Sequence, residues 1–469
     1  MTKFKFYCEW HATSGNDEPA YQHTMADLAL YVGEMSLMLN ENIWSQTIHK
    51  SALLSAYPLA MWLASSWWRL NWEPLPACGI YPSVDWRMAH ELGAANRGFV
   101  WPRIIFASDG DMMQVWTGAL NNNDNQSLRY LKSLEAPAFI PLPDFQREAE
   151  DFINRVLNRL DDNDCPDTDL ANLWKLIQAD RAERESAKYR RLEATMGYDP
   201  DECPEEIIDK ALDLENRMGE DALSELIPIY GRKKPFADIE EIADSDGLVG
   251  VPATVADTSE KGMPCQHAVD AYGRKKTFTD IADSGVPATA ADTSEKGMPW
   301  QHAVDAARAL RQAIGNTNNM IDDANLCELL GLRASDVEKW VPDKRNDVAL
   351  AIPIAENQYK FIPRKRHPLA KRFEIARFIG DGILTGSATG QWLTSTDLRT
   401  SRQKYQRAFA AEFLCPMTSL REFLQDDFSE SAIEDAVEHF QVSETTVNNR
   451  LIPLVSMYGY SDGSLPYHL

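Results

Sequence analysis

Residues 367–384 read HPLAKRFEIARFIGDGIL, and this stretch carries most of the information about the fold. We expect one helix that begins at Pro368 and leaves His367 outside, because proline is tolerated in the first turn of a helix. Further helices are expected over 300–314, 322–331, 402–414, 418–425, 430–440 and 444–452. Residues 348–354 and 359–362 predict two strands. Residues 298–469 are therefore predicted to form a mostly helical domain with a small sheet.

The N-terminal part, residues 1–145, is rich in tryptophan, with nine of the 13 tryptophans before residue 120. Alternating runs over 3–10 and 100–106 predict strands, and Asp109-Gly110 predicts a turn before a strand over 113–117. Residues 51–68 carry no charge, but Pro58 and four serines favour a buried helix over a membrane span. This part is predicted to be a compact α+β domain, and its role is not indicated by the sequence.

Residues 146–229 form an acidic region with 23 acidic and 11 basic residues. Apolar residues recur there at helical spacing, which predicts amphipathic helices with a solvated acidic face. A tandem duplication follows: residues 230–271 and 272–306 both begin with YGRKK and end with QHAVDA. We expect 230–297 to be largely a flexible linker, with only the second copy running into the last domain.

The composition excludes collagen-like, fully disordered and coiled-coil proteins. The chain has 469 residues, of which 44% are hydrophobic and 25% charged, as in ordinary globular proteins. A formal net charge of −24 disfavours general binding to nucleic acid or anionic lipid. Seven scattered cysteines without a CxxC pair indicate reduced thiols. With no hydrophobic leader at the N-terminus, the sequence predicts a cytoplasmic protein without a membrane segment.

Several blocks of the last domain share the pattern of a known family. Residues 372–384 (RFEIARFIGDGIL) resemble the core helix of the ImmA/IrrE metallopeptidases, which typically reads RFxxAHExGHxLL. Residues 409–416 (FAAEFLCP) resemble the family's FAAxLLMP segment, and 442–451 resemble its VSxxxVxxRL ending. Residues 299–311 resemble its opening helix. The resemblance covers about 298–455 and implies a zincin-like fold for this domain.

The positions that would carry the chemistry differ from the family pattern. A zinc peptidase needs two histidines at i and i+4 as ligands and an adjacent Glu as general base. Here the HExxH positions hold Arg377-Phe378-Ile379-Gly380-Asp381, and the third, acidic ligand aligns with Gln403. Arginine repels the cation and phenylalanine transfers no proton. We therefore expect no catalytic residue, metal or cofactor, and an ion pair between Arg377 and Asp381 instead.

Two other groups of residues are candidates for a metal site. His367, Glu374 and Asp381 are spaced by seven residues and would form a substitute site if one helix spanned all three. His90-Glu91 begins like HExxH, but Ala94 stands where the second histidine would be. The sequence favours neither site.

Two features bear on partners. Arg364, Lys365 and Arg366 form a basic run that either contacts a phosphate or acidic partner, lies in a solvated loop, or pairs with the acidic region. Residues 433–451 have the rhythm of a helix-turn-helix, with Ser429 and Ser443 as N-caps. Their acidic first helix disfavours DNA, so nucleic acid is not expected as a partner.

These observations predict a non-catalytic regulatory or adaptor protein, a pseudopeptidase that binds a protein partner in the old substrate cleft. The family resemblance implies a bacterial protein acting beside a repressor, a stress regulator or a mobile or defence element. Two alternatives stay open: a metallopeptidase with a rearranged site that cleaves a regulatory protein, and a DNA-binding transcriptional regulator. A further possibility is an activity in residues 1–145, where His90, Glu91, Asp85, Asp109 and Asp111 supply polar groups, but their spacing does not indicate a particular chemistry.

Overall fold

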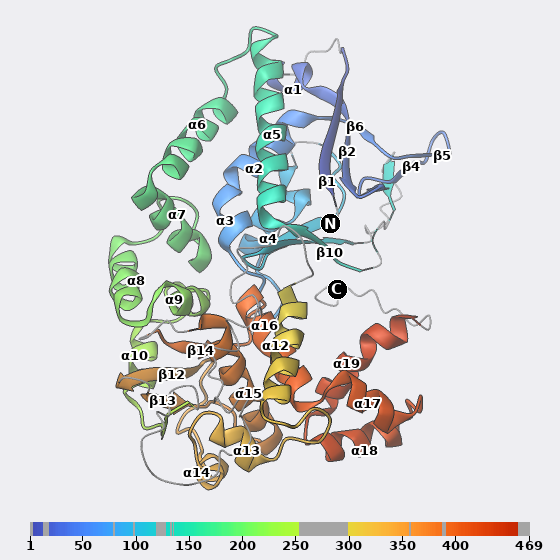
Figure 1. The fold of residues 1–469 in the computed structure, drawn as a ribbon. Coiled ribbons are helices and arrows are strands. Elements are labelled where there is room, and N and C mark those ends of the chain that lie inside the picture. Colours follow the sequence, from blue (N-terminus) through green and yellow to red (C-terminus); the bar gives the residue numbers. More distant parts are fainter. Residues whose placement is uncertain are drawn as a thin grey trace. The chain divides into compact units, whose positions relative to one another are not determined.

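The computed structural model describes residues 3–457 apart from 13–17, 78–79, 97–98, 119–127, 132–133, 135, 253–298, 356–357 and 387–390. The fold is α+β, as predicted, with several small antiparallel sheets (Figure 1). The chain forms two compact units. Unit 1 is built mainly from Met1–Asp209, and unit 2 from Lys210–Asp397 and Ser401–Ser461.

The described residues of unit 1 form three antiparallel sheets. The first has β1 (Phe4–Trp10), β2 (Met25–Val32), β3 (Met35–Ser36) and β6 (Ala52–Ser55); the second has β7 (Ile104–Ser108), β8 (Met112–Thr117) and β10 (Ala138–Pro141); the third has β4 (Asn40–Asn42), β5 (Thr47–His49) and β9 (Leu128–Tyr130). The strands expected over 3–10 and 113–117 are confirmed, whereas the one expected over 100–106 begins at Ile104.

The helices of unit 1 are α1 (Pro19–His23), α2 (Ala56–Ser65), α3 (Trp67–Trp72), α4 (Val84–His90), the 3₁₀ turn η1 (Leu92–Ala95), α5 (Leu142–Asp161), α6 (Asp169–Ala182) and α7 (Arg184–Met196). The single helix expected over 51–68 is wrong. Its first residues form β6, which pairs with β2, and Ser55 then caps α2 by accepting a hydrogen bond from Tyr57 N. No helix in the described ranges is long and apolar enough to cross a membrane.

The helices expected in the acidic region are present, but they are divided between the two units. One face of α5, with Phe145, Phe152 and Val156, is buried in the core of unit 1, and the Phe152 ring stacks on Phe6 of β1 at 5.0 Å. The N-terminal part was expected to end at residue 145, but this residue lies inside α5, which packs in unit 1. The boundary between the units falls within α8 (Glu205–Met218), and α9 (Glu220–Leu226) belongs to unit 2.

Unit 2 has one four-stranded antiparallel sheet in the order β11 (Leu248–Gly250), β13 (Gln358–Ile362), β12 (Ala349–Ala355) and β14 (Leu393–Ser395). Its other helices are α10 (Ala237–Asp244), α12 (Pro299–Ala313), α13 (Asp323–Glu328), α14 (Ala334–Lys339), α15 (Pro368–Thr385), α16 (Ser401–Leu414), α17 (Met417–Leu424), α18 (Glu430–Phe440) and α19 (Glu444–Met457). All seven helices expected for this region are present, as is the strand pair β12–β13, while α14 and β14 were not foreseen.

The first repeat copy is folded in part, contrary to the expected linker. Its residues form α10 and the edge strand β11, whose Leu248 pairs with Phe361. At Gly250 a Cβ atom would lie 2.3 Å from Leu330 O, so this strand requires glycine at its point of closest approach. The second copy up to residue 298 lies outside the described residues.

Candidate functional site

The four positions that align with peptidase site residues lie on α15 and α16, which pack against each other in unit 2. Gly380 permits this close packing, because a Cβ there would lie 2.7 Å from the ring of Phe409. Phe378 is fully buried and meets the Phe361 ring of β13 edge-on at 5.6 Å. Phe378 is therefore a core residue that joins α15 to the sheet.

Arg377 is buried and directed at the sheet and at α16. Its Nη2 donates to Thr396 O at 2.7 Å and to Gln403 Oε1. Burial, together with repulsion from Arg407 and Arg364, lowers the pKa of Arg377 to about 9. A cation placed here would face the positive charge of the guanidinium group.

Asp381 does not pair with Arg377, so the predicted ion pair is wrong. Its carboxylate is fully buried and accepts two hydrogen bonds from Arg402, Nε to Oδ1 at 2.7 Å and Nη2 to Oδ2 at 2.8 Å. Burial acts to lower the pKa of Arg402, but the charge and hydrogen bonds of Asp381 outweigh it and raise that pKa. Arg402 reaches Asp381 from the neighbouring helix with two parallel hydrogen bonds. This bidentate geometry explains why Asp381 pairs with Arg402.

Strand β14 joins both pairs into one network. Thr394 N donates to Asp381 Oδ2 at 3.0 Å, and Thr394 O accepts from Gln403 Nε2 at 3.2 Å and from Gln406 Nε2 at 2.8 Å. Thr396 N also donates to Gln403 Oε1 at 2.8 Å. The aligned positions thus belong to a buried hydrogen-bond network that connects α15, α16 and β14. Neither the role of Arg402 nor strand β14 was predicted from the sequence. The one available signal was that Arg402 directly precedes Gln403, the position aligned with the third ligand.

The basic run does not form one solvated surface. Arg364 is buried and donates to Glu374 Oε1 at 3.1 Å and to both carboxylate oxygens of Asp397 at 2.6 and 2.9 Å. Burial raises the pKa of Asp397, but Arg364 outweighs it and lowers that pKa to about 2. Lys365 approaches Asp397 at 3.7 Å, and Arg366 is exposed. The acidic partners are Glu374 and Asp397, not the residues of 146–229.

No described group of three His, Cys, Asp or Glu side chains could hold a metal ion. In the substitute site considered above, His367 precedes α15 as its N-cap residue, Glu374 binds Arg364 and Asp381 binds Arg402. The two carboxylates are therefore occupied by guanidinium groups.

The second near-match to a metal motif, His90-Glu91, is structural as well. His90 is fully buried in unit 1, contacts Phe106 O at 3.0 Å and Glu73 Oε2 at 3.2 Å, and stacks on Trp86 at 4.0 Å. Glu91 binds Arg87 and Arg103. The two side chains thus serve separate networks.

The expected helix-turn-helix is formed by α18 and α19, and both predicted N-caps are confirmed. Ser429 accepts from Ala432 N and Ser443 from Thr446 N. Arg450, the basic residue of the second helix, binds the buried Glu412 of α16. Its guanidinium therefore stabilises the packing of α19 rather than offering a phosphate contact.

Comparison with known proteins gave no match: no family model, no curated protein and no solved structure corresponds significantly to this chain.

Proposed function

We propose that this chain is a non-catalytic regulatory or adaptor protein whose unit 2 is a degenerate ImmA/IrrE-like, zincin-like domain that binds a protein partner. One observation carries the proposal: Arg377 donates to Gln403, Asp381 accepts from Arg402, and Gln403 also accepts from Thr396 N, so the aligned positions are not left open for a metal and a water molecule. A hydrolytic zinc site needs an open coordination position, and a core filled by two arginine-centred networks offers none at this place.

A surface on α17 and α18 supports a protein as the partner. Phe423 and Phe428 are 39% and 37% exposed, and Phe423 stacks on His439 at 4.6 Å. The same segment exposes one basic residue, Arg421, and seven acidic residues, namely Glu422, Asp426, Asp427, Glu430, Glu434, Asp435 and Glu438. Aromatic rings are enriched in protein interfaces, and a surface with an excess of one charge favours a partner of the opposite charge. This acidic aromatic surface fits a basic protein and disfavours DNA, for which it carries the wrong charge.

The first experiment tests the absence of chemistry. Purified full-length protein is analysed for zinc content, and its thermal unfolding is followed with and without a chelator. We expect substoichiometric zinc and an unchanged melting temperature. A fourfold variant, Arg377→His, Phe378→Glu, Asp381→His and Gln403→Glu, carries the family's residue types and serves as the positive control for zinc uptake. Stoichiometric zinc in the wild-type chain, with chelator-sensitive proteolysis, would refute the proposal.

The second experiment tests the partner. The tagged full chain is recovered from a bacterial lysate and bound proteins are identified by mass spectrometry. We expect a basic protein to bind the wild type and the control Asp343→Lys but not Glu434→Lys. Equal recovery with both variants would exclude the acidic aromatic surface, and retention of DNA alone would favour the transcriptional-regulator alternative.

A further inference from the structure

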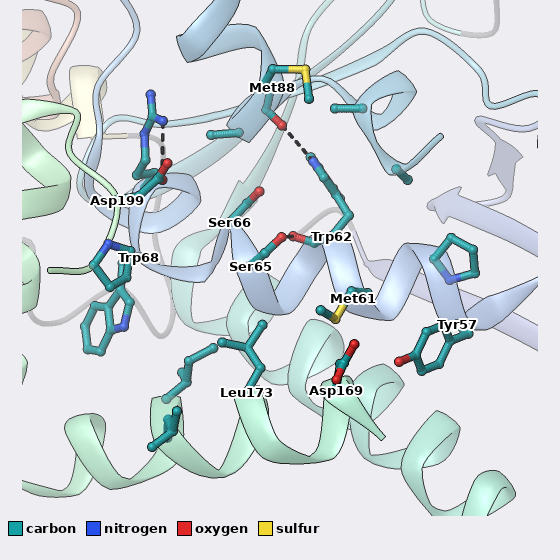
Figure 2. Close-up of a pocket in the computed structure, with 18 of the residues that line it drawn as sticks. Tyr57, Met61, Trp62, Ser65, Ser66, Trp68, Met88, Asp169, Leu173 and Asp199 are labelled. Carbon is teal, nitrogen blue, oxygen red and sulfur yellow. Dashed lines mark hydrogen bonds and ion pairs between the residues drawn. The ribbon is translucent and has the colours of Figure 1, made fainter. Parts of the chain in front are cut away.

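Unit 1 contains a cavity of about 820 Å³ to which the sequence assigned no role. This volume lies within the usual range for sites that enclose a small molecule. Helices α2 and α3 form one wall and α6 forms another (Figure 2). Tyr57 and Met61 of α2 point toward Asp169 and Leu173 of α6 across the cavity.

The helical repeat explains why these residues face the cavity. Tyr57, Met61 and Ser65 are spaced by four residues and share one face of α2, whereas Leu59 and Leu63 lie in the core of unit 1. On α6 the lining residues Asp169, Leu173, Leu176, Ile177 and Asp180 follow the same helical spacing. Two amphipathic faces therefore meet here with side chains that are partly aromatic and partly acidic.

The charges of the wall favour a cation. Six carboxylates line the cavity against two guanidinium groups: Glu18, Asp85, Asp169, Asp180, Asp199 and Asp201 against Arg69 and Arg190. Both arginines already have carboxylate partners. Arg69 binds Glu73 at 2.8 Å and Asp85 at 3.0 Å, and Arg190 binds Asp180 and Asp201, both at 2.8 Å. They are thereby neutralised and do not create a site for an anion.

Two of the carboxylates have no ion pair within the described ranges, namely Glu18 and Asp169, and both act on Tyr57. Burial raises the pKa of the Tyr57 phenol, and the charges of Asp169 and Glu18 raise it further. Tyr57 therefore stays neutral, and its ring meets the Tyr21 ring edge-on at 5.4 Å. Neutral aromatic faces beside unpaired carboxylates attract organic cations through both the ring quadrupole and direct charge.

Two tryptophans add aromatic surface to the wall and differ in their hydrogen bonding. Trp68 lines the cavity, is 4% exposed, and its indole Nε1 has no hydrogen-bond partner in the described part of the chain. The neighbouring Trp62 differs, since its Nε1 donates to Met88 O at 3.0 Å (Figure 2). The Trp68 donor has no accessible surface, so Trp68 contributes the apolar part of its indole to the wall rather than a polar contact.

We propose that this cavity binds a small organic cation, an ammonium or guanidinium group on an aromatic or aliphatic body, with the charge held beside Tyr57, Asp169 and Glu18. The apolar body would lie against Met61 and Leu173. This inference concerns unit 1 and stands or falls independently of the function proposed for unit 2.

The test uses the full-length chain and three probes of one shape: 4-phenylbutylamine, the neutral 4-phenylbutanol and the anionic 5-phenylpentanoate. Binding is measured by calorimetry and by tryptophan fluorescence, to which Trp62 and Trp68 of the wall contribute. We expect saturable binding of the amine, with affinity for the alcohol lower by about tenfold or more and no measurable binding of the carboxylate.

Two variants and a matched control locate the site. Asp169→Asn and Glu18→Gln should each weaken amine binding by about fivefold, a size typical of one lost charge contact. Asp167→Asn removes the same charge two residues away, outside the cavity wall, and should bind like the wild type. Equal binding of the amine and the alcohol, unchanged affinity in both cavity variants, or no saturable binding of the amine would each overturn the proposal.

Discussion

Asp381 of α15 and Arg402 of α16 form a bidentate ion pair, with Nε–Oδ1 and Nη2–Oδ2 distances of 2.7 and 2.8 Å. The Asp381 side chain is fully buried and that of Arg402 is 9% exposed. The pair links the two helices directly. Replacing only one partner of such a buried ion pair lowers the stability of the fold, because the other charge stays in the core without a partner.

That asymmetry gives the first prediction. Arg402→Met should lower the free energy of unfolding by about 3–5 kcal/mol, because Asp381 is left buried without its partner. The double change Arg402→Met with Asp381→Leu should recover much of this loss, since no unpaired charge remains. Chemical denaturation of all three proteins measures the difference. Arg345→Met, at an exposed site, is the control and should change stability by less than about 0.5 kcal/mol. A double variant as unstable as the single one would argue against the pair.

The glycines of α15 give a second prediction. Gly380→Ala should destabilise the protein by about 1–3 kcal/mol, because the new Cβ would lie 2.7 Å from the Phe409 ring and force α15 and α16 apart. Gly382→Ala is the matched control two residues away, where the nearest atom to a Cβ is Leu393 Cδ1 at 3.8 Å. That change should be neutral or stabilising by up to about 1 kcal/mol, because alanine favours the helix. Similar losses in both variants would contradict the close packing at Gly380.

Helix positions in unit 2 were predictable because they depend on local periodicity and capping. Pro368 begins α15 and Ser429 caps α18, as expected from neighbouring residues alone. The partner of Asp381 was not predictable by the same means. The rule for residues four apart favoured Arg377, but the tertiary fold brings Arg402 to the carboxylate from a helix 21 residues away. Buried ion pairs are chosen by tertiary geometry, which local spacing does not report.

The errors in the N-terminal part have a related cause. An uncharged run such as 51–68 is compatible with either helix or strand, and pairing with Met25–Leu28 of β2 decides in favour of a strand for Ala52–Ser55. The acidic charge of 146–229 indicated solvent exposure, yet the buried face of α5 determines which unit it joins. Net charge describes the outer faces of these helices and carries no information on what their apolar faces contact.

A third prediction concerns acid stability. Arg364 holds the pKa of Asp397 at about 2, below its ordinary value of 3.8, so the folded state binds its proton at lower pH than the unfolded state. The contribution of Asp397 is therefore complete above about pH 4 and is lost as the pH falls toward about 2. Because the side chain is 56% exposed, solvent screening limits the effect to about 1 kcal/mol.

The measurement is the difference in unfolding free energy between the wild type and Asp397→Asn at several pH values. We expect the difference to be largest near neutrality and to shrink between pH 4 and 2, because the pKa of Asp397 in the folded state is about 2. Asp343→Asn removes an exposed carboxylate that has no ion pair in the described ranges, and its difference should not vary with pH in this way. A pH-independent difference for Asp397→Asn would mean that Arg364 does not lower its pKa.

The tandem duplication supplies the last prediction, because the two copies are not equivalent. Copy two lacks the counterparts of Ile239–Glu241 and Asp246–Val249, which in copy one complete α10 and provide Leu248 and Val249 of β11. Deleting these seven residues from copy one should therefore cost about 3 kcal/mol or more, since Ile239 is fully buried and Leu248 pairs with Phe361.

Deleting residues 254–288 instead restores a single copy and changes no described residue. It shortens the connection between Pro252 and Pro299 from 46 to 11 residues, which lowers the cost of loop closure and should stabilise the chain by about 1 kcal/mol. Denaturation curves of the two deletions distinguish the copies, and a harmless first deletion or a costly second one would mean that copy two can form the edge of the sheet.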